Sequence, residues 1–413
     1  MLTAAGVLTQ AGHEARLRQL FMPPVSPAGP RIGAEVEFLV LNARTQRPAS
    51  TRESLLPLLH AHGAARGWRF VESGKGGPRY TLPSGGVIAI EPGGQLEYAS
   101  PPFPSPAALL ADLHAVLVPL SDDAGSRGIR FLGAGIDPHN AFDAAPLQIE
   151  AERYRRMDAY FASIGPAGQR MMRQTAAVQL NVDPVDAHGT WRMLNAAAPV
   201  LVAAFANSRL YAGTDSGHAS CRAETWRHAD ASRTGLFPCE REPAEEYAAF
   251  VLCARTMLVP GTNGAYPPFR ELGALADEAT LANHLTTLFP EIRPKGYLEI
   301  RSIDAQAIEW LAAPVLVAGA LALDARAMQE AAERLGAPDA LRLETAGRRG
   351  LRDAWLHDAA LDVFDIAIRA CVRRGQPWYG GRNLETAIAF RDRFTRRGRA
   401  PGDEAALPST DVR

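Results

Sequence analysis

The chain has 413 residues, with 44 Lys and Arg residues against 45 Asp and Glu residues and a formal net charge of −1. This length supports one large domain or two coupled domains, and 47% hydrophobic with 22% charged residues excludes global disorder. The near-neutral charge gives no electrostatic case for a nucleic acid or a membrane surface as a partner.

The four cysteines form no C-x-x-C pair and are too few for a disulfide framework, which favours a reducing compartment. No apolar run follows a basic start, so we expect no signal peptide. The longest apolar stretch, about residues 308–323, contains Glu309 and is too short to span a bilayer. We therefore expect a soluble, cytoplasmic protein.

The predicted elements follow from apolar periodicity and from Gly and Pro clusters. Helices are expected over residues 8–21, 52–66, 105–127, 146–170, 188–208, 244–257, 276–288, 305–335 and 340–374. Strands are expected over 32–41, 68–71, 86–91, 95–100, 129–134, 175–183 and 295–303, and loops over 22–30, 73–78, 101–106 and 261–268.

Strand patterns stop after about residue 304, and only helical patterns follow. This predicts an α+β fold with a catalytic domain over 1–335 and a helical C-terminal extension over 336–413 packed on it. Residues 400–413 carry almost no apolar periodicity and are expected to be a frayed tail.

Four of the predicted strands carry polar side chains at alternate positions. These pairs are Glu35 with Glu37, Gln95 with Glu97, Gln179 with Asn181, and Glu299 with Arg301. Because side chains alternate between the two faces of a strand, each pair points to one face while apolar neighbours point to the other. One face of the sheet is therefore expected to be polar and acidic, and the other apolar and covered by helices.

For any single pair, a solvated sheet face is the more common explanation. Four carboxylates together are harder to explain in that way, because like charges on neighbouring strands repel. Carboxylate and amide oxygens without His or Cys clusters are the ligands of Mg²⁺ or Mn²⁺, and Mg²⁺ commonly binds nucleotide phosphates. Without a P-loop motif, arginine side chains are expected to hold the phosphates.

Two arginine-rich segments meet that requirement. Arg170 and Arg173 precede the strand over 175–183, and residues 207–235 carry Arg222, Trp226 and Arg233 with little apolar periodicity. We interpret the second segment as a long functional loop. On spacing alone, solvated surface arginines and a core position for Trp226 fit equally well.

The strings GAEVEFLVL, IEPGGQLEYAS, RMMRQTAAVQLNVD, ANSRLYAG with SCRAETW and SRTG, and HLTTLFPEIRPKGYLEIRSID resemble glutamate-cysteine ligases of the plant and actinobacterial type. The resemblance runs from about Gly33 to about Ala332. It implies a glutamine-synthetase-like antiparallel sheet funnel, with helices on its outer face. It also implies an enzyme that uses ATP and Mg²⁺, or Mn²⁺ as a substitute, to join glutamate to cysteine in thiol biosynthesis.

The resemblance also implies roles for individual residues. Metal and phosphate ligands would be Glu35, Glu37, Glu91, Glu97, Gln179 and Glu299; nucleotide contacts Asn181, Trp226 and Arg233; substrate contacts Gln95, Arg173 and Arg222; and catalytic groups Arg222 and Arg301. Gln179 stands where some distant relatives have histidine. Relieved repulsion predicts that Glu37→Gln or Glu299→Gln abolishes turnover and leaves the thermal midpoint unchanged or raised.

Three functions remain open from the residues and the resemblance. The first is formation of γ-glutamylcysteine through a γ-glutamyl phosphate, leading to glutathione or ergothioneine. The second is ligation of a different amine, and the third is a catalytically silent relative that binds nucleotide or amino acid. Oligomeric state, monomer or homodimer, is left open.

Overall fold

The computed structural model describes residues 10–21, 29–73, 76–259 and 266–404. Within these residues, nine antiparallel strands form one large sheet in the order β12-β13-β7-β1-β5-β4-β3-β2, and β6 pairs with the far end of β1. The strands are β1 Ile32–Asn42, β2 Arg69–Ser73, β3 Gly77–Thr81, β4 Val87–Ile90, β5 Leu96–Ala99, β6 Ile129–Leu132, β7 Ala177–Val182, β12 Ile292–Pro294 and β13 Leu298–Asp304.

Two small sheets lie beside the large one. They pair β8 Leu210–Tyr211 with β9 Thr214–Asp215, and β10 Thr234–Gly235 with β11 Phe289–Pro290.

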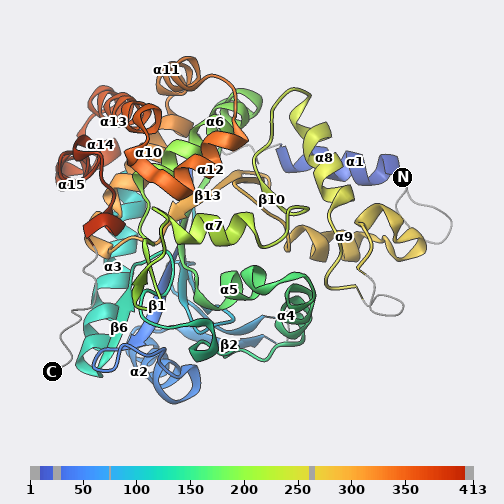
Figure 1. Ribbon diagram of the computed structural model, residues 1–413. Coiled ribbons are helices and arrows are strands. Elements are labelled where there is room, and N and C mark those ends of the chain that lie inside the picture. The colour runs from blue at the N-terminus through green and yellow to red at the C-terminus, as the bar shows by residue number, and fades with distance from the viewer. Residues whose placement is uncertain (1–9, 22–28, 74–75, 260–265, 405–413) are drawn as a thin grey trace.

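Helices cover both faces of the large sheet (Figure 1). The first eight are α1 Gln10–Arg18, α2 Leu56–Ala64, α3 Pro106–Ser126, α4 Glu152–Ile164, α5 Pro166–Gln174, α6 Ala187–Ala204, α7 Cys221–Arg227 and α8 Pro243–Cys253. The others are α9 Glu278–Leu285, α10 Ala312–Leu323, α11 Ala325–Leu335, α12 Ala340–Arg349, α13 Ala354–Arg374, α14 Gln376–Tyr379 and α15 Gly381–Arg393.

The apolar sheet face packs against α3, α6 and α10. Val36, Leu96, Leu180 and Ile300 on the four central strands are fully buried there. Each such side chain contributes about 1.5–3 kcal/mol when it is removed from water. The C-terminal helices α12, α13 and α15 pack in turn on α6 and α10 and share this hydrophobic core. This confirms the expected covered face, whereas the domain boundary at residue 335 stays a prediction.

Three predicted helices are each broken in two. Gly165, with φ of 134°, separates α4 from α5, and Gly350, with φ of 54°, ends α12 before α13 begins. These φ values favour glycine, so the helix stops there despite continued apolar periodicity. Asp324 caps α11 by accepting a hydrogen bond from the amide of Ala327, and the chain bends by 96° at this residue.

Other expectations were wrong. Segment 73–78 was expected as a loop, but β2 reaches Ser73 and β3 starts at Gly77. The expected long loop over 207–235 contains α7, and β12, α14 and α15 were missed. Residues Pro401–Glu404 form a 3₁₀ turn in which Asp403 pairs with Arg209 and Arg352, so the expected fraying does not include them. Residues 405–413 of that tail, and residues 22–28 and 261–265 of the expected loops, lie outside the described residues.

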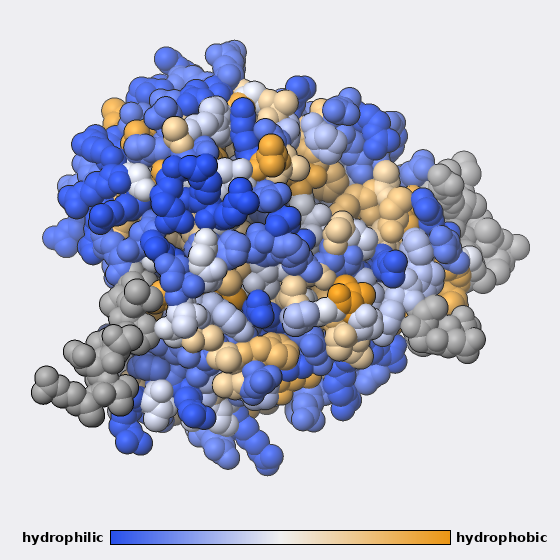
Figure 2. Space-filling view, viewed as in Figure 1, coloured by the Kyte–Doolittle hydropathy of each residue, from blue (hydrophilic) through white to orange (hydrophobic). Residues whose placement is uncertain are grey.

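The apolar residues are concentrated inside the molecule. Figure 2 shows mostly hydrophilic surface over the C-terminal helices, with apolar residues in smaller patches. In the described part of the chain, no single helix has the length and apolar composition needed to cross a membrane, although η7 and α10 (308–323) together with α11 pass as a bent pair. Every residue of α10 is buried in the core.

Candidate active site

The four strands with alternating polar residues are neighbours in the sheet, in the order β13-β7-β1-β5. Their register places Glu35 opposite Gln179, Glu37 opposite Glu97, and Asn181 opposite Glu299. A bulge in β13 between Ile300 and Ile303 shifts the register by one residue, so that the apolar Ile303 pairs with Val178. The polar side chains therefore share one face of the sheet.

A cavity of about 230 Å³ lies over this face. It is lined by Glu35, Glu37, Glu91, Pro92, Gln95, Glu97, Arg153, Tyr154, Met157, Met171, Met172, Thr175, Gln179, Trp226, Thr286, Phe289, Arg293 and Arg301. The sheet supplies most of the acids, while α4, α5 and α7 supply most of the apolar and aromatic groups. A larger cavity of about 570 Å³ lies beside α1 and α8 and contains none of the predicted site residues.

Four of the lining carboxylates crowd one another. Burial and the nearby charge of Glu91 raise the pKa of Glu37 to about 8. Burial and the charge of Glu35 raise the pKa of Glu91 to about 6. Burial, followed by the charges of Glu91, Glu35 and Glu37, raises the pKa of Glu97 well above its usual value. This wall of the cavity therefore resists full ionisation unless a cation is nearby.

Glu37 is held in place by its neighbours on β7. Its two oxygens accept hydrogen bonds from the amide of Ala177 at 2.8 Å and from Nε2 of Gln179 at 2.9 Å. The Oε1 atom of Gln179 accepts a hydrogen bond from Arg301. Both ends of the Gln179 amide are therefore engaged, and Gln179 connects an acid to a cation.

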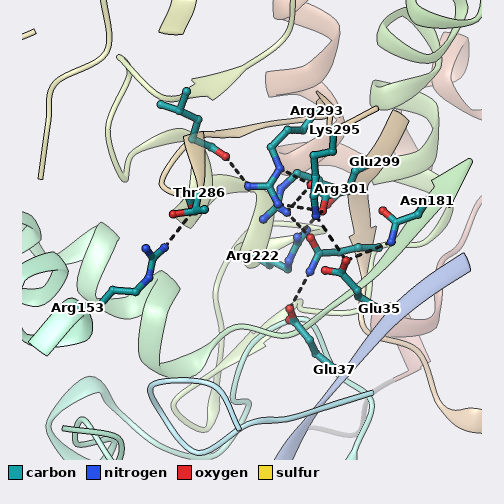
Figure 3. A network of polar contacts seen from close by, with 12 residues as sticks. Glu35, Glu37, Arg153, Asn181, Arg222, Thr286, Arg293, Lys295, Glu299 and Arg301 are labelled. Carbon is teal, nitrogen blue, oxygen red and sulfur yellow. Dashed lines mark hydrogen bonds and ion pairs between the residues drawn. The ribbon is translucent and has the colours of Figure 1, made fainter. Parts of the chain in front are cut away.

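Glu299 differs from the other carboxylates, because basic side chains surround it (Figure 3). It is 0% exposed and contacts Arg293 at 2.5 and 2.9 Å, Arg301 at 2.9 Å and Lys295 at 3.1 Å. Burial opposes its ionisation, but Arg293, Arg301 and Lys295 outweigh burial and hold the pKa of Glu299 well below its usual value.

The expectation that Glu299 takes part in unrelieved repulsion is therefore wrong. Its charge is compensated within the protein, and Glu299 does not line the cavity. Glu299 instead holds the basic side chains of Arg293, Lys295 and Arg301 in place beside the cavity.

Trp226 lies beside two of the predicted arginines. The guanidinium carbon of Arg301 is 5.2 Å from the centre of the indole ring, and that of Arg222 is 5.3 Å from it. Arg222 donates to the carbonyl oxygen of Arg301 at 2.9 Å, so it supports the strand that carries Arg301. The Nε atoms of both arginines and Nε1 of Trp226 are buried without a hydrogen-bond partner in the described structure. Trp226 and Arg301 line the cavity, so a polar ligand there fits their two donors, whereas Arg222 does not line it.

Asn181 bridges two strands of the acidic face. Its Nδ2 atom donates to Glu35 at 3.1 Å, and its Oδ1 atom is buried without a partner among the described groups.

Two of the predicted contact residues, Arg233 and Arg173, have partners within the protein. Arg233 is fully buried outside the cavity and donates to Asp230, Thr287 and the carbonyl oxygen of Arg255. Arg173 pairs with Asp158 and does not line the cavity either. The structure therefore shows only protein partners for these two side chains, and their expected ligand contacts stay predictions.

Gln95 does line the cavity, but its amide is used by the backbone. Nε2 donates to the carbonyl oxygens of Met172 and Thr175 at 3.3 and 2.9 Å, and Oε1 accepts from the amide of Gly93. Gln95 therefore fixes the β4–β5 turn against the end of α5.

Sequence reasoning missed several lining residues, most notably Arg153, Arg293 and the three methionines. Arg153 extends from α4 and donates to the carbonyl oxygen of Thr286 at 3.2 Å (Figure 3). Arg293 and Lys295 stand two apart just before β13, a spacing that could have indicated basic groups on the face of Glu299. The methionines carry no sequence signal of their own, since buried methionine is common in any core.

Within the described residues, no group of three or more His, Cys, Asp or Glu side chains is arranged to hold a metal ion by itself. The four cavity carboxylates nevertheless have the donor chemistry of a site for a hard cation. Since they repel one another and have raised pKa values, a cation shared with a phosphate-bearing ligand fits this wall.

The sequence profile of glutamate-cysteine ligase family 2 (GCS2) matches residues 31–406. The chain belongs to this family. It is 33% identical over 345 residues to the glutamate–cysteine ligase EgtA of Mycolicibacterium smegmatis, an alignment covering 78% of each chain. It is 30% identical over 396 residues to the chloroplastic glutamate–cysteine ligase of Nicotiana tabacum, covering 87% of this chain and 73% of the relative. The family and these relatives identify the chain as an enzyme of the glutamate–cysteine ligase class.

The fold agrees with this family. A glutamate–cysteine ligase from Francisella tularensis, solved in complex with AMP, superimposes with a TM-score of 0.51 at 12% identity. The superposition covers 92% of this chain and 84% of that chain. The expected α+β fold, with a large antiparallel sheet covered by helices, is confirmed.

Proposed function

We propose that this enzyme uses ATP to join the γ-carboxylate of glutamate to the amine of L-cysteine, with release of ADP and phosphate. The observation that carries the proposal is one cavity in which four crowded carboxylates face Arg153, Arg293 and Arg301, in a chain of this family. A carboxylate is a poor acyl donor, so the γ-carboxylate attacks the γ-phosphorus of ATP to form a γ-glutamyl phosphate. The cysteine amine then displaces phosphate.

Glu35, Glu37, Glu91 and Glu97 would hold Mg²⁺, or Mn²⁺ as a substitute, together with the phosphates of ATP. The bound cation would neutralise the phosphate charges. We do not assign Glu299 and Gln179 as ligands, because their oxygens already accept from the cationic side chains of Arg293, Lys295 and Arg301. The oxygens of Glu37 accept only from neutral amide groups, so Glu37 has no cationic partner of this kind.

The basic side chains have a separate role in this proposal. Glu299 fixes Arg293, Lys295 and Arg301 so that their charge is presented without reorganisation, which is how preorganised groups stabilise a transferring phosphoryl group. The Arg301 Nε atom is buried and unpartnered and can donate to that group. Arg153 supplies a cation on the helical side for a substrate carboxylate.

The supporting parts of the chain follow from the same proposal. Residues 1–335 would contain all the reacting groups, and 336–413 would support α6 and α10 behind the sheet. All four cysteines are free thiols, which fits a cytoplasmic enzyme.

The test is phosphate release from ATP in the presence of Mg²⁺ and glutamate, with and without cysteine, and with the product mass recorded. Cysteine-dependent release with the mass of γ-glutamylcysteine is the expected result. Glutamate-dependent release that ignores cysteine would redirect the proposal to another amine. Absence of release with every acceptor would favour a catalytically silent relative.

A further inference from the structure

The helical side of the cavity is formed largely by three methionines. Met157 of α4 and Met171 and Met172 of α5 all line the cavity, and they are only 5%, 6% and 4% exposed. They belong to a hydrophobic cluster separate from the main core, against which Tyr154, Trp226 and Phe289 pack. These three aromatic residues line the same cavity. We call Met157, Met171 and Met172 the methionine wall.

The three methionine side chains of this wall offer no hydrogen-bond donor to a bound side chain. The polar residues next to it, Gln95 and Thr175, use their side chains on backbone carbonyls of Met171, Met172 and Thr175. Thioether sulfur is polarisable and accepts hydrogen bonds only weakly. A hydroxyl or charged group packed against these thioethers would lose its hydration and gain only a weak acceptor in return. A methyl group or a thiol would lose little.

The size of the cavity decides which substrate meets this wall. Its volume of about 230 Å³ is below the roughly 300–1,000 Å³ of typical small-molecule pockets, so the cavity does not enclose a whole nucleotide together with both amino acids. Two small amino acids suit it better. The glutamate side chain ends in the carboxylate that must reach the phosphates. The side chain of the amine acceptor is therefore the group left to face the methionines.

Close packing fixes the wall relative to the acids. A Cβ atom on Gly168 of α5 would lie 1.9 Å from Phe161 of α4, so only glycine allows the two helices to approach this closely. A Cβ atom on Gly93, next to Glu91 in the β4–β5 turn, would lie 2.1 Å from the carbonyl oxygen of Arg173 at the end of α5. The distance from the acidic face to the methionine wall is thus set by close contacts at these two glycines.

We propose that Met157, Met171 and Met172 are the specificity-determining residues for the amine acceptor. They select a small side chain that ends in a thiol or methyl group and reject hydroxyl and charged side chains. This inference rests on the proposed function, because it assigns the acceptor part of the same cavity.

The first measurement needs no variant. The wild-type enzyme is assayed with cysteine, 2-aminobutyrate, serine and aspartate as acceptors, because 2-aminobutyrate replaces the thiol with a methyl group and serine replaces it with a hydroxyl. The kcat/KM for 2-aminobutyrate should exceed that for serine at least tenfold. Equal values for serine and 2-aminobutyrate would overturn the proposal.

The second measurement uses Met157→Gln, Met171→Gln and Met172→Gln, with the matching Leu variants as controls. Glutamine keeps the length of methionine but adds hydrogen-bonding groups, so the serine to 2-aminobutyrate ratio of kcat/KM should rise at least tenfold in one or more Gln variants. The Leu variants should keep the wild-type ratio. An unchanged ratio in all Gln variants, with a raised KM for ATP, would place the nucleotide at this wall and overturn the proposal.

Hydroxylamine separates this inference from the proposed function. It is a small nucleophile that traps a γ-glutamyl phosphate as the hydroxamate without a side chain to recognise. If the Gln variants form hydroxamate at the wild-type rate, they fold and activate glutamate. A change in their serine to 2-aminobutyrate ratio of kcat/KM then reflects only the contact between the acceptor side chain and the methionine wall. Failure of the wild-type enzyme to form hydroxamate would refute the proposed function itself.

Discussion

Replacing Glu299 and Glu97 by glutamine should change the stability of this enzyme in opposite directions. The two residues have the same chemistry and lie on the same face of one sheet, but their surroundings differ. Glu299 is fully buried among Arg293, Lys295 and Arg301, whereas Glu97 lies among Glu91, Glu35 and Glu37. Glu299→Gln leaves three basic groups without their shared counterion. Glu97→Gln removes one of several mutually repelling charges.

The size of the effect follows from the burial of Glu299. Breaking a buried ion pair by removing one partner costs about 3–5 kcal/mol. An unfolding entropy of about 2.1 cal/mol/K per residue converts this into a fall of roughly 3–6 °C in the thermal midpoint of a 413-residue chain. Glu97→Gln should leave the midpoint unchanged or raise it. Both variants should lose turnover.

The assay is thermal unfolding of wild type, Glu97→Gln and Glu299→Gln without nucleotide or metal, followed by the phosphate-release assay. Glu299→Asp serves as a control, because it keeps the charge and shortens the side chain. An unchanged or raised midpoint for Glu299→Gln would refute the reasoning from compensated charge. An equal fall for Glu97→Gln would show that loss of packing, and not electrostatics, governs both sites.

Three further outcomes are expected. Glu37 must ionise to bind a cation, and with a pKa of about 8 its ionised fraction grows as pH rises. The Mg²⁺ concentration that gives half the maximal rate should therefore fall between pH 6 and pH 8. The same Mg²⁺ concentration at every pH in this range would contradict the prediction. Between pH 4.5, the ordinary pKa of a Glu carboxyl, and about pH 8, Glu37 is protonated in the folded chain but ionised in the unfolded chain when no metal is bound. Its contribution to the free energy of unfolding therefore falls as pH rises through this window. Added Mg²⁺ should make this fall smaller in thermal unfolding curves. Arg153→Met should lower kcat/KM by about 10- to 100-fold, which corresponds to the loss of one hydrogen bond to a charged group. The thermal midpoint should change little, because Arg153 donates to a single carbonyl oxygen in the protein. Wild-type values of kcat/KM in this variant would show that Arg153 does not contact the substrate.

Local pattern determined much of the acidic face. The alternation in β1, β5, β7 and β13 fixed which side chains point together, because the period of two is a property of the backbone. It placed Glu35, Glu37 and Glu97 on one face, and Val36, Leu96 and Leu180 on the other, before any neighbour was known. The same alternation left open the order of the strands.

Helix ends were harder to predict, because apolar periodicity continues through the breaks at Gly165, Asp324 and Gly350. The glycines end helices by adopting positive φ, and Asp324 ends one by capping the next. Helix α7 was missed because it has only seven residues, most of them polar, and so carries little apolar periodicity. In such segments, packing against the rest of the protein outweighs local propensity.

By itself, the sequence determined the residue types of the site and the face that carries them, because both follow from local geometry. Only the tertiary structure decided what each charge meets. Glu299 and Glu97 look alike in the sequence, but β12 brings Arg293 to Glu299, and the β4–β5 turn brings Glu91 to Glu97. Arg233 and Arg301 both look like ligand-binding arginines, but one is enclosed by backbone carbonyls and the other lines the cavity. Electrostatic energy depends on distance through space and on burial, and neither is encoded by position along the chain.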